Sequence, residues 1–313
     1  MEKPVFYLLD VFAEEKYAGN QLAVFRFVTE LSDVQMQRIA KEMHFSETTF
    51  ILSDKKHDGG YDVRIFTPET ELNFAGHPTL GTAFLIQREI IRKPVKEVVL
   101  NLKAGKIPVF FDYTSKDSCI LWMKQFQPTF GKAYDARLVS SILSLDVHDI
   151  NTSFPIQEVS TGLPVIIVPL KTLESVKKAR INKDEYFRFI KDIDAKTILI
   201  FCPETYNKAN DLNVRFFADQ YGIPEDPATG SANGCLASYL VMHRFFGTHQ
   251  INLRVEQGYE IGRPSLLYLR AEKKQQDFSV YVGGKVELIG NGKLVQTVKT
   301  QYRHAKSHLP PAN

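Results

Sequence analysis

Two loops of this chain combine predicted helix starts with side chains that can move a proton. The first loop covers residues 66–83 and contains His77, and the second covers residues 217–234 and contains Asp226. Each loop leads from a predicted strand to Gly, Ser or Thr at a helix start, where several backbone N–H groups have no partner within the helix. Such starts bind anions readily. Two of them facing one cleft could hold a carboxylate while a proton moves beside it.

Either loop taken alone is better explained as an ordinary capped helix start. The two loops together, with His77 in one and the dipeptide Glu225-Asp226 in the other, favour a shared functional site. We therefore expect the two loops to face each other.

Glu47 is a third candidate, because it lies where a predicted helix is followed by a strand. A carboxyl group in that position could shuttle a proton, particularly if burial raises its pKa toward the working pH. The alternative is a turn or surface carboxylate, which sequence periodicity does not exclude.

The elements that would position these residues occur twice. The sequence VRIF at 63–66 returns as VRFF at 214–217, and GTA at 81–83 returns as GSA at 230–232. Matches in the same order and at nearly the same offset indicate a duplicated domain. A repeat of this length, seen twice, predicts two lobes of similar topology with a cleft between them, where a ligand would bind by default.

Strand patterns dominate both halves, and helices are few. Each half is predicted to be a mostly antiparallel sheet around a central helix, and residues 128–154 are predicted to cross between the halves. The predicted domains are 1–127, carrying Glu47 and His77, and 128–313, carrying Asp226 and Ser231, with the last residues able to pack back on the first lobe. Strands are predicted at 5–12, 48–52, 62–66, 98–102, 157–160, 165–169, 197–201 and 213–217, and helices at 32–43, 78–88, 136–145, 183–191 and 230–245.

Composition narrows the possible partners and location. With 313 residues, 44% hydrophobic and 24% charged, the chain is typical of globular proteins. A net charge of +3 with mixed signs requires neither nucleic acid nor an anionic membrane as a partner. No apolar run approaches the roughly 20 residues that span a bilayer, and the first residues lack a signal-peptide pattern, so a cytoplasmic location is expected. Cys119, Cys202 and Cys235 fit neither a disulfide framework nor a zinc site with paired ligands.

Taken together, the motifs resemble the PhzF family of phenazine-biosynthesis proteins, whose fold is similar to that of diaminopimelate epimerase. The resemblance covers nearly the whole chain, and Gln21 is one departure, since the family usually has Pro after Gly-Asn. It is carried by DVF at 10–12, GN at 19–20, SETTF at 46–50, RIFTP at 64–68, GHPT at 76–79, EDPATGSA at 225–232, QG at 257–258, GRPS at 262–265 and VGG at 282–284.

The resemblance implies an α+β fold of two pseudo-symmetric lobes, each a mostly antiparallel, barrel-like sheet around a central helix. It also implies a homodimer and an isomerase that moves a proton on a small cyclic carboxylate with no cofactor and no metal. Glu47 matches the family's acid/base residue. The loops carry no cysteine, which disfavours the two-thiol mechanism of related epimerases and racemases. The implied site consists of Glu47, His77 and Asp226 as catalytic residues and of Ser46, Gly76, Gly230 and Ser231 as substrate contacts.

Two other functions remain open. The chain could be an epimerase or racemase that uses carboxylates on another small acid. It could also be a small-molecule-binding or scaffold protein that kept the cleft and lost the reaction. The presence of Glu47, His77 and Asp226 speaks against the second alternative.

Overall fold

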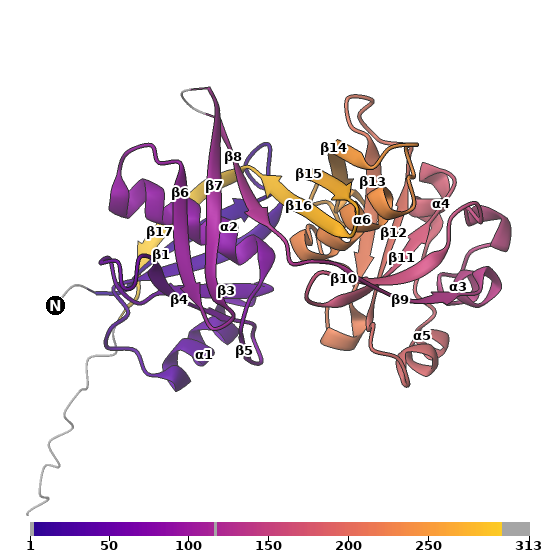
Figure 1. Ribbon diagram of the computed structural model, residues 1–313. Coiled ribbons are helices and arrows are strands. Elements are labelled where there is room, and N and C mark those ends of the chain that lie inside the picture. The colour runs from indigo at the N-terminus through magenta and orange to yellow at the C-terminus, as the bar shows by residue number, and fades with distance from the viewer. Residues whose placement is uncertain (1–2, 116–117, 296–313) are drawn as a thin grey trace, which may run out of the picture.

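The computed structural model describes residues 3–115 and 118–295, and Figure 1 shows them as two lobes that the chain crosses between twice. One crossing joins β8 (Ser118–Lys124) to β9 (Thr129–Tyr134), and the other joins β16 (Asp277–Gly284) to β17 (Val286–Lys293). The predicted domain boundary at 127/128 falls within the first crossing. The predicted α+β class is confirmed. In the described ranges, no helix is long and apolar enough to cross a bilayer.

The first lobe contains every strand and helix predicted for it, within a few residues, and Ser32 caps its first helix through a capping box. β17 returns from the second lobe and pairs with β1. The elements of the first lobe are β1 (Val5–Val11), β2 (Asn20–Arg26), α1 (Asp33–Met43), β3 (Glu47–Ile51), β4 (Tyr61–Phe66), β5 (Glu71–Leu72), α2 (Gly76–Leu85), a π-helical turn (Ile86–Ile91), β6 (Glu97–Leu102), β7 (Gly105–Ser115) and β8.

The second lobe corrects one prediction. Residues 128–154 are more than a crossing, because β9 pairs with β10 as part of the second sheet. The strand pattern of β9 is weak because most of its residues are exposed. The lobe contains β9, α3 (Ala136–Ile142), β10 (Ile156–Ser160), β11 (Pro164–Pro169), α4 (Leu173–Lys178), α5 (Lys183–Ile190), β12 (Thr197–Cys202), β13 (Leu212–Phe217), α6 (Gly230–Met242), β14 (Gln250–Gln257), β15 (Ser265–Lys274) and β16.

Strand pairing confirms the duplication. In the first lobe β2–β3 is parallel, β3–β4 antiparallel and β4–β6 parallel. The second lobe repeats this order with β11–β12, β12–β13 and β13–β14. Parallel neighbours need a long crossover connection, and α2 and α6 lie in the matching crossovers of the two lobes. The two helices therefore occupy equivalent positions.

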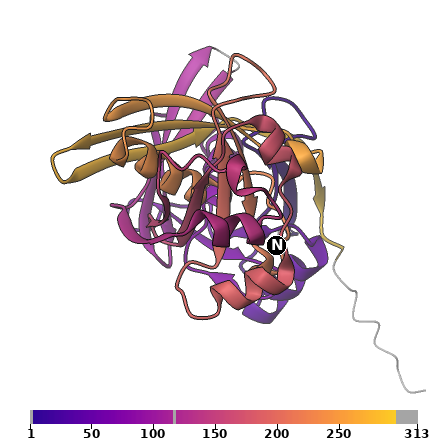
Figure 2. The ribbon, with the colours of Figure 1, turned by 90° about the vertical axis from the view of Figure 1, so that its right-hand side faces the viewer.

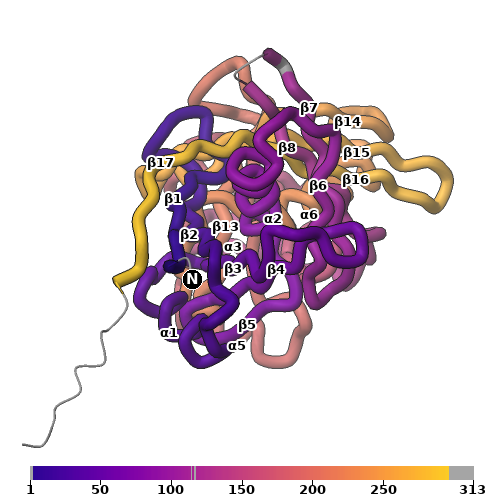
Figure 3. Tube along the Cα trace, turned by 90° about the vertical axis from the view of Figure 1, so that its left-hand side faces the viewer, coloured from indigo at the N-terminus to yellow at the C-terminus, as the bar shows by residue number. Residues whose placement is uncertain are grey.

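These two helices are the centres of their lobes. Both are rich in apolar and small residues on all sides and are buried almost throughout, as expected for helices enclosed by other elements. Figure 3 shows the strands of the first lobe arranged around α2. At Gly81 a Cβ would come within 2.5 Å of the Leu22 side chain, so α2 and β2 lie very close together at this glycine. Figure 2 shows the other helices of the second lobe on its outer side.

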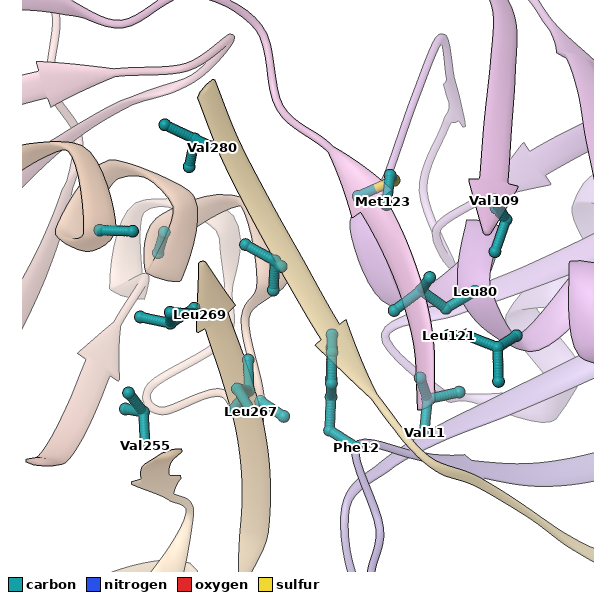
Figure 4. Packing of buried hydrophobic residues seen from close by; sticks show 14 of the residues in the cluster. Val11, Phe12, Leu80, Val109, Leu121, Met123, Val255, Leu267, Leu269 and Val280 are labelled. Carbon is teal, nitrogen blue, oxygen red and sulfur yellow. The ribbon is translucent and has the colours of Figure 1, made fainter. Parts of the chain in front are cut away.

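One hydrophobic cluster runs through both lobes, and each lobe has a further cluster of its own. Phe12 lies at the junction, fully buried, with residues of the first lobe such as Leu121 on one side and of the second such as Leu267 on the other (Figure 4). Its N–H donates to the carbonyl of Lys285 at 2.8 Å, and its carbonyl accepts from the N–H of Leu266 at 2.9 Å. Phe12 therefore joins the lobes by packing and by backbone hydrogen bonds.

We predict that Phe12→Ala lowers the free energy of unfolding by roughly 3–5 kcal/mol, because it leaves a cavity in a close-packed junction. Urea denaturation measures this difference. Phe246→Ala, at an exposed aromatic, is the control and should change stability by no more than about 0.5 kcal/mol. Equal losses in the two variants would contradict a central role for Phe12 in joining the lobes.

Candidate active site

Glu47 is the first residue of β3 and lies on the face of the strand that packs against α2. Side chains alternate along a strand, and Thr49, two residues later, is hydrogen bonded to Thr82 of α2 at 2.8 Å between hydroxyl oxygens. Glu47 therefore points to the same side, near the start of α2. Its Oε2 lies 3.4 Å from Nε2 of His77.

Both of these atoms are buried without a hydrogen-bond partner among the described residues. The Glu47 side chain is 16% exposed and that of His77 is 6% exposed. Most buried polar atoms in folded proteins are hydrogen bonded, so two neighbouring buried atoms without hydrogen bonds call for an explanation. A carboxyl and an imidazole that the protein leaves unpaired can both bond to a bound substrate.

Burial keeps both groups neutral. It raises the pKa of Glu47 to about 8, and the nearby charge of Asp226 acts in the same direction. It lowers the pKa of His77 to about 3, against a smaller opposite effect of a backbone hydrogen bond with Gln21. At neutral pH the contact is therefore between a largely protonated carboxyl and a neutral imidazole, and is not an ion pair. A carboxyl with a pKa near the working pH can both take up and return a proton.

Asp226 approaches this pair from the second lobe. Nδ2 of Asn20, in the first lobe, donates to Asp226 Oδ1 at 3.0 Å and to the carbonyl of Ala228 at 2.9 Å. The Thr229 hydroxyl donates to Asp226 Oδ2. Burial raises the pKa of Asp226 to about 6, although the hydrogen bonds from Thr229 and Asn20 act to lower it. The sequence prediction did not include Asn20 in the site, although the Gly-Asn motif contains it.

Gln257 is a second residue that the prediction missed. Its Nε2 donates to the carbonyl of Asp226 at 2.8 Å. Its Oε1 accepts from the N–H of Thr229 at 3.2 Å and from Nδ2 of Asn233 at 2.9 Å. Gln257 is fully buried and holds the loop before α6 in place. The only signal in the sequence was the Gln-Gly motif.

The two helix starts face each other, as predicted from the loops. A Cβ built on Gly76 would lie 3.5 Å from both the Cα of Gly230 and the backbone nitrogen of Ser231. Neither N-cap residue, Ala75 or Thr229, caps its helix through the side chain. Backbone N–H groups of both helices therefore concentrate partial positive charge at one place, which favours a bound anion.

The remaining predicted residues divide into two groups. Ser46 and Ser231 are half-buried beside Glu47 and Gly230. Glu225, in contrast, does not join Asp226 in the site, because it forms a bidentate pair with Arg215 at 2.9 and 2.7 Å. The first lobe contains an equivalent pair, in which Nε and Nη2 of Arg64 donate to the two carboxylate oxygens of Glu71, each at 2.8 Å. These two pairs brace the two loops.

The thiols are poorly suited to proton transfer. Burial raises the pKa of Cys235 to about 11, and its sulfur lies 3.5 Å from the Thr161 hydroxyl. Burial also raises the pKa of Cys202 to about 12 and that of Cys119 to about 11. Over the described ranges, His, Cys, Asp and Glu form no group of three that could hold a metal ion. Independence from a cofactor stays a prediction.

Comparison with known proteins finds relatives that the chain matches over nearly their whole length. The family model described as phenazine biosynthesis-like protein, PhzC-PhzF, matches residues 9–292. Trans-2,3-dihydro-3-hydroxyanthranilate isomerase of Pseudomonas aeruginosa is 33% identical over 287 residues, which cover 92% of this chain and 95% of that protein. An uncharacterized isomerase of Pasteurella multocida is 32% identical over 292 residues, with coverage of 92% and 93%.

Solved structures agree with this placement. The PhzF-family phenazine biosynthesis protein of Bacillus anthracis superposes with a TM-score of 0.85 at 27% identity, covering 95% of this chain and 100% of that one. A probable proline racemase of Agrobacterium radiobacter superposes with a TM-score of 0.60 at 10% identity, with 93% of each chain covered. The second likeness shows a common fold alone.

We predict that Glu47→Gln makes the protein more stable at alkaline pH. The carboxyl has a higher pKa in the folded state than its ordinary value of 4.5, so its contribution to stability is present below about pH 4.5 and is lost as the pH rises through about 8. The free energy of unfolding of the variant should exceed that of the wild type by at least about 1 kcal/mol at pH 9. A difference of one between the pKa values of the folded and unfolded states corresponds to about 1.4 kcal/mol.

Denaturation of both proteins at pH 5 and pH 9 measures this effect. Glu42→Gln, at an exposed residue of α1, is the matched control and should follow the wild type at both pH values. A stability difference between Glu47→Gln and wild type that did not grow with pH would contradict the raised pKa.

Proposed function

We propose that this isomerase, which belongs to the PhzF family of phenazine biosynthesis-like proteins, moves a proton on a small cyclic carboxylate and uses Glu47 as its acid/base group. The observation that carries this proposal is the buried, unpaired Oε2 of Glu47, 3.4 Å from a neutral His77 and next to the two facing helix starts. The relatives named trans-2,3-dihydro-3-hydroxyanthranilate isomerase support it.

The reaction needs one group that acts first as a base and then as an acid. Ionised Glu47 removes a proton from a ring carbon, and the electrons of that C–H bond enter the conjugated system. The double bond shifts, and the protonated carboxyl then delivers the proton to another carbon on the same face. Since the pKa of Glu47 is about 8, both of its forms are populated near neutral pH. The product has the same atoms as the substrate.

The other groups of the site bind the substrate and stabilise charge. Backbone N–H groups at Gly76 and Gly230 hold the substrate's carboxylate, where the partial positive charge of both helices also stabilises negative charge that develops in the transition state. His77 and Asp226 bind polar ring substituents, with Ser46 and Ser231 beside them. A homodimer, a cytoplasmic location and independence from cofactors are further proposals that rest on the family resemblance.

We predict that Glu47→Gln lowers proton transfer by a hundredfold or more, on the order of what a positioned acid/base group contributes. The amide keeps the shape of the side chain but cannot cycle a proton. Trans-2,3-dihydro-3-hydroxyanthranilate, the compound named for the relatives, is the first substrate to test in deuterated water, with NMR to follow deuterium entering the ring.

Glu42→Gln is the control here too and should exchange at the wild-type rate. Exchange at the wild-type rate in Glu47→Gln would remove Glu47 from the mechanism. Deuterium at a carbon whose configuration inverts would identify an epimerase. Binding of cyclic carboxylates without any exchange would identify a protein that has lost the reaction.

A double variant, Cys202→Ala with Cys235→Ala, should keep turnover within about threefold of wild type, because buried thiols of raised pKa offer no thiolate. The same NMR assay measures this, with circular dichroism to establish that the variant is folded. A folded double variant without turnover would replace the carboxylate mechanism by a thiol mechanism.

A further inference from the structure

The two buried carboxyl groups of the candidate site differ in the hydrogen-bond donors around them. Both oxygens of Asp226 accept a hydrogen bond, Oδ1 from Nδ2 of Asn20 at 3.0 Å and Oδ2 from the hydroxyl of Thr229. Oε2 of Glu47, in contrast, has no hydrogen-bond partner among the described residues. Donors that bond to a carboxyl group stabilise its ionised form. The donors therefore favour a negative charge on Asp226 rather than on Glu47.

The strands place Asn20 on the same side of the sheet as Glu47. Asn20 begins β2, and Leu22, two residues later, lies against Gly81 of α2, so Asn20 also points toward the α2 side. Leu22 is the register partner of Glu47 in the parallel pair β2–β3. Asn20 and Glu47 therefore project from neighbouring strands to the same side, and from there Asn20 reaches Asp226 of the second lobe.

The backbone determines which end of the Asn20 side chain faces Asp226. Nδ2 of Asn20 also donates to the carbonyl of Ala228 at 2.9 Å, and a carbonyl oxygen can only accept. With the amide turned round, its oxygen would face this carbonyl oxygen instead. Asn20 therefore uses its two amide hydrogens on two acceptors, and it meets Asp226 as a donor.

Gln257 fixes the direction of the Thr229 hydroxyl in a similar way. Its Oε1 accepts from the N–H of Thr229, and its Nε2 donates to the carbonyl of Asp226, so backbone groups assign both ends of the amide. Nε2 also donates to the hydroxyl oxygen of Thr229 at 3.2 Å. The hydroxyl hydrogen is thus directed at Oδ2 of Asp226. A proton on Oδ2 that pointed at Thr229 would displace this hydrogen, for which the described residues offer no other acceptor.

We propose that Asn20 and Thr229 are positioning residues that determine which carboxyl group carries the exchangeable proton, because they hold Asp226 as an ionised acceptor and leave the proton on Glu47. Gln257 acts through Thr229. The charge of Asp226 disfavours ionisation of Glu47, so the carboxyl group that the donors stabilise ionises first and the other keeps its proton. The inference rests on the proposed function, in which Glu47 exchanges this proton, and adds the residues that assign the proton to Glu47.

The other groups around Asp226 do not favour its charge. Burial and the charge of Glu225 both act to raise the pKa of Asp226, and Glu225 is itself bound to Arg215. On the side of the first lobe lie Glu47 and the neutral His77. The donors Asn20 and Thr229 are uncharged. The preference for a charge on Asp226 therefore depends on the direction of their hydrogen bonds.

Carbon-13 NMR on protein labelled at the side-chain carboxyl carbons of Asp and Glu tests the proposal without any substrate. Loss of a signal in Asp226→Asn and in Glu47→Gln identifies the two groups, and Asp226 should ionise at a lower pH than Glu47 in the wild type. Thr229→Val keeps the shape of the side chain but lacks the hydroxyl. It should bring the two ionisation midpoints closer by about one pH unit, the size expected for one hydrogen bond to a charged group. Thr229→Ser is the matched control, because it keeps the hydroxyl and should titrate like the wild type.

Asn20→Leu should act in the same direction as Thr229→Val, and it keeps the test valid if circular dichroism shows that Thr229→Val is unfolded. The pH at which deuterium exchange reaches half of its maximum should follow the midpoint of Glu47 in each variant, which a merely structural role of Thr229 would not cause.

Three results would overturn the proposal. These are a Glu47 that ionises before Asp226 in the wild type, midpoints that stay unchanged in both Thr229→Val and Asn20→Leu, and equal displacements in Thr229→Val and Thr229→Ser. Deuterium exchange that persists in Glu47→Gln would refute the proposed function instead, while the NMR midpoints would still determine which carboxyl group carries the proton.

Discussion

The close approach of two helix starts is the constraint on which this structure depends. A Cβ built on either Gly76 or Gly230 would lie in van der Waals contact with the backbone of the other residue. Both helix ends carry partial positive charge and repel each other, so negative charge nearby stabilises their approach. Asp226 lies only four residues before Gly230, and a bound carboxylate would act in the same sense. The geometry that brings the lobes together thus also gathers the helix starts at which we propose that a carboxylate binds.

Docking of the lobes and assembly of the site share residues. Arg263 of the second lobe donates to Asp10 at 2.7 Å and to the carbonyl of Gly19 at 3.0 Å, both in the first lobe. Asn20, which follows Gly19 in the chain, donates to Asp226. A displacement of one lobe would therefore disturb the hydrogen bonds of Asp226 as well as the contact at Phe12. The duplicated Arg–Glu pairs keep each loop rigid relative to its own sheet.

Burial acts on the pKa values of Glu47 and His77 in opposite directions, and this makes the contact between the two side chains stable. It raises the pKa of Glu47 and lowers that of His77, so both are neutral near pH 7. Burying two neutral groups costs far less free energy than burying an unpaired charge. The protein can therefore keep two unpaired polar atoms inside the lobes. The same desolvation brings the pKa of the carboxyl to a range in which it can exchange a proton.

Several features of the molecule were encoded locally and could be predicted from the sequence by itself. The repeat, the capped helix from Ser32 and the two buried helices follow from periodicity and small-residue motifs, which depend on neighbours a few positions away. β9 escaped prediction because its side chains are mostly exposed and leave no apolar alternation. The motifs also pointed to Glu47, His77 and Asp226. The position of Glu47 between a predicted helix and a predicted strand suggested that it could shuttle a proton, whereas the assignment of all three as catalytic residues came from the family resemblance.

Tertiary structure decided what surrounds these residues. Asn20 bonds to Asp226 across 206 positions of the chain, and Gln257 reaches the same loop from β14. Glu225 and Asp226 are adjacent in sequence, yet one is neutralised by an arginine and the other faces the site. A pKa depends on desolvation and on charges a few ångströms away, and such neighbours come from distant parts of the chain. Which carboxyl can exchange a proton is therefore determined only when both lobes are in place.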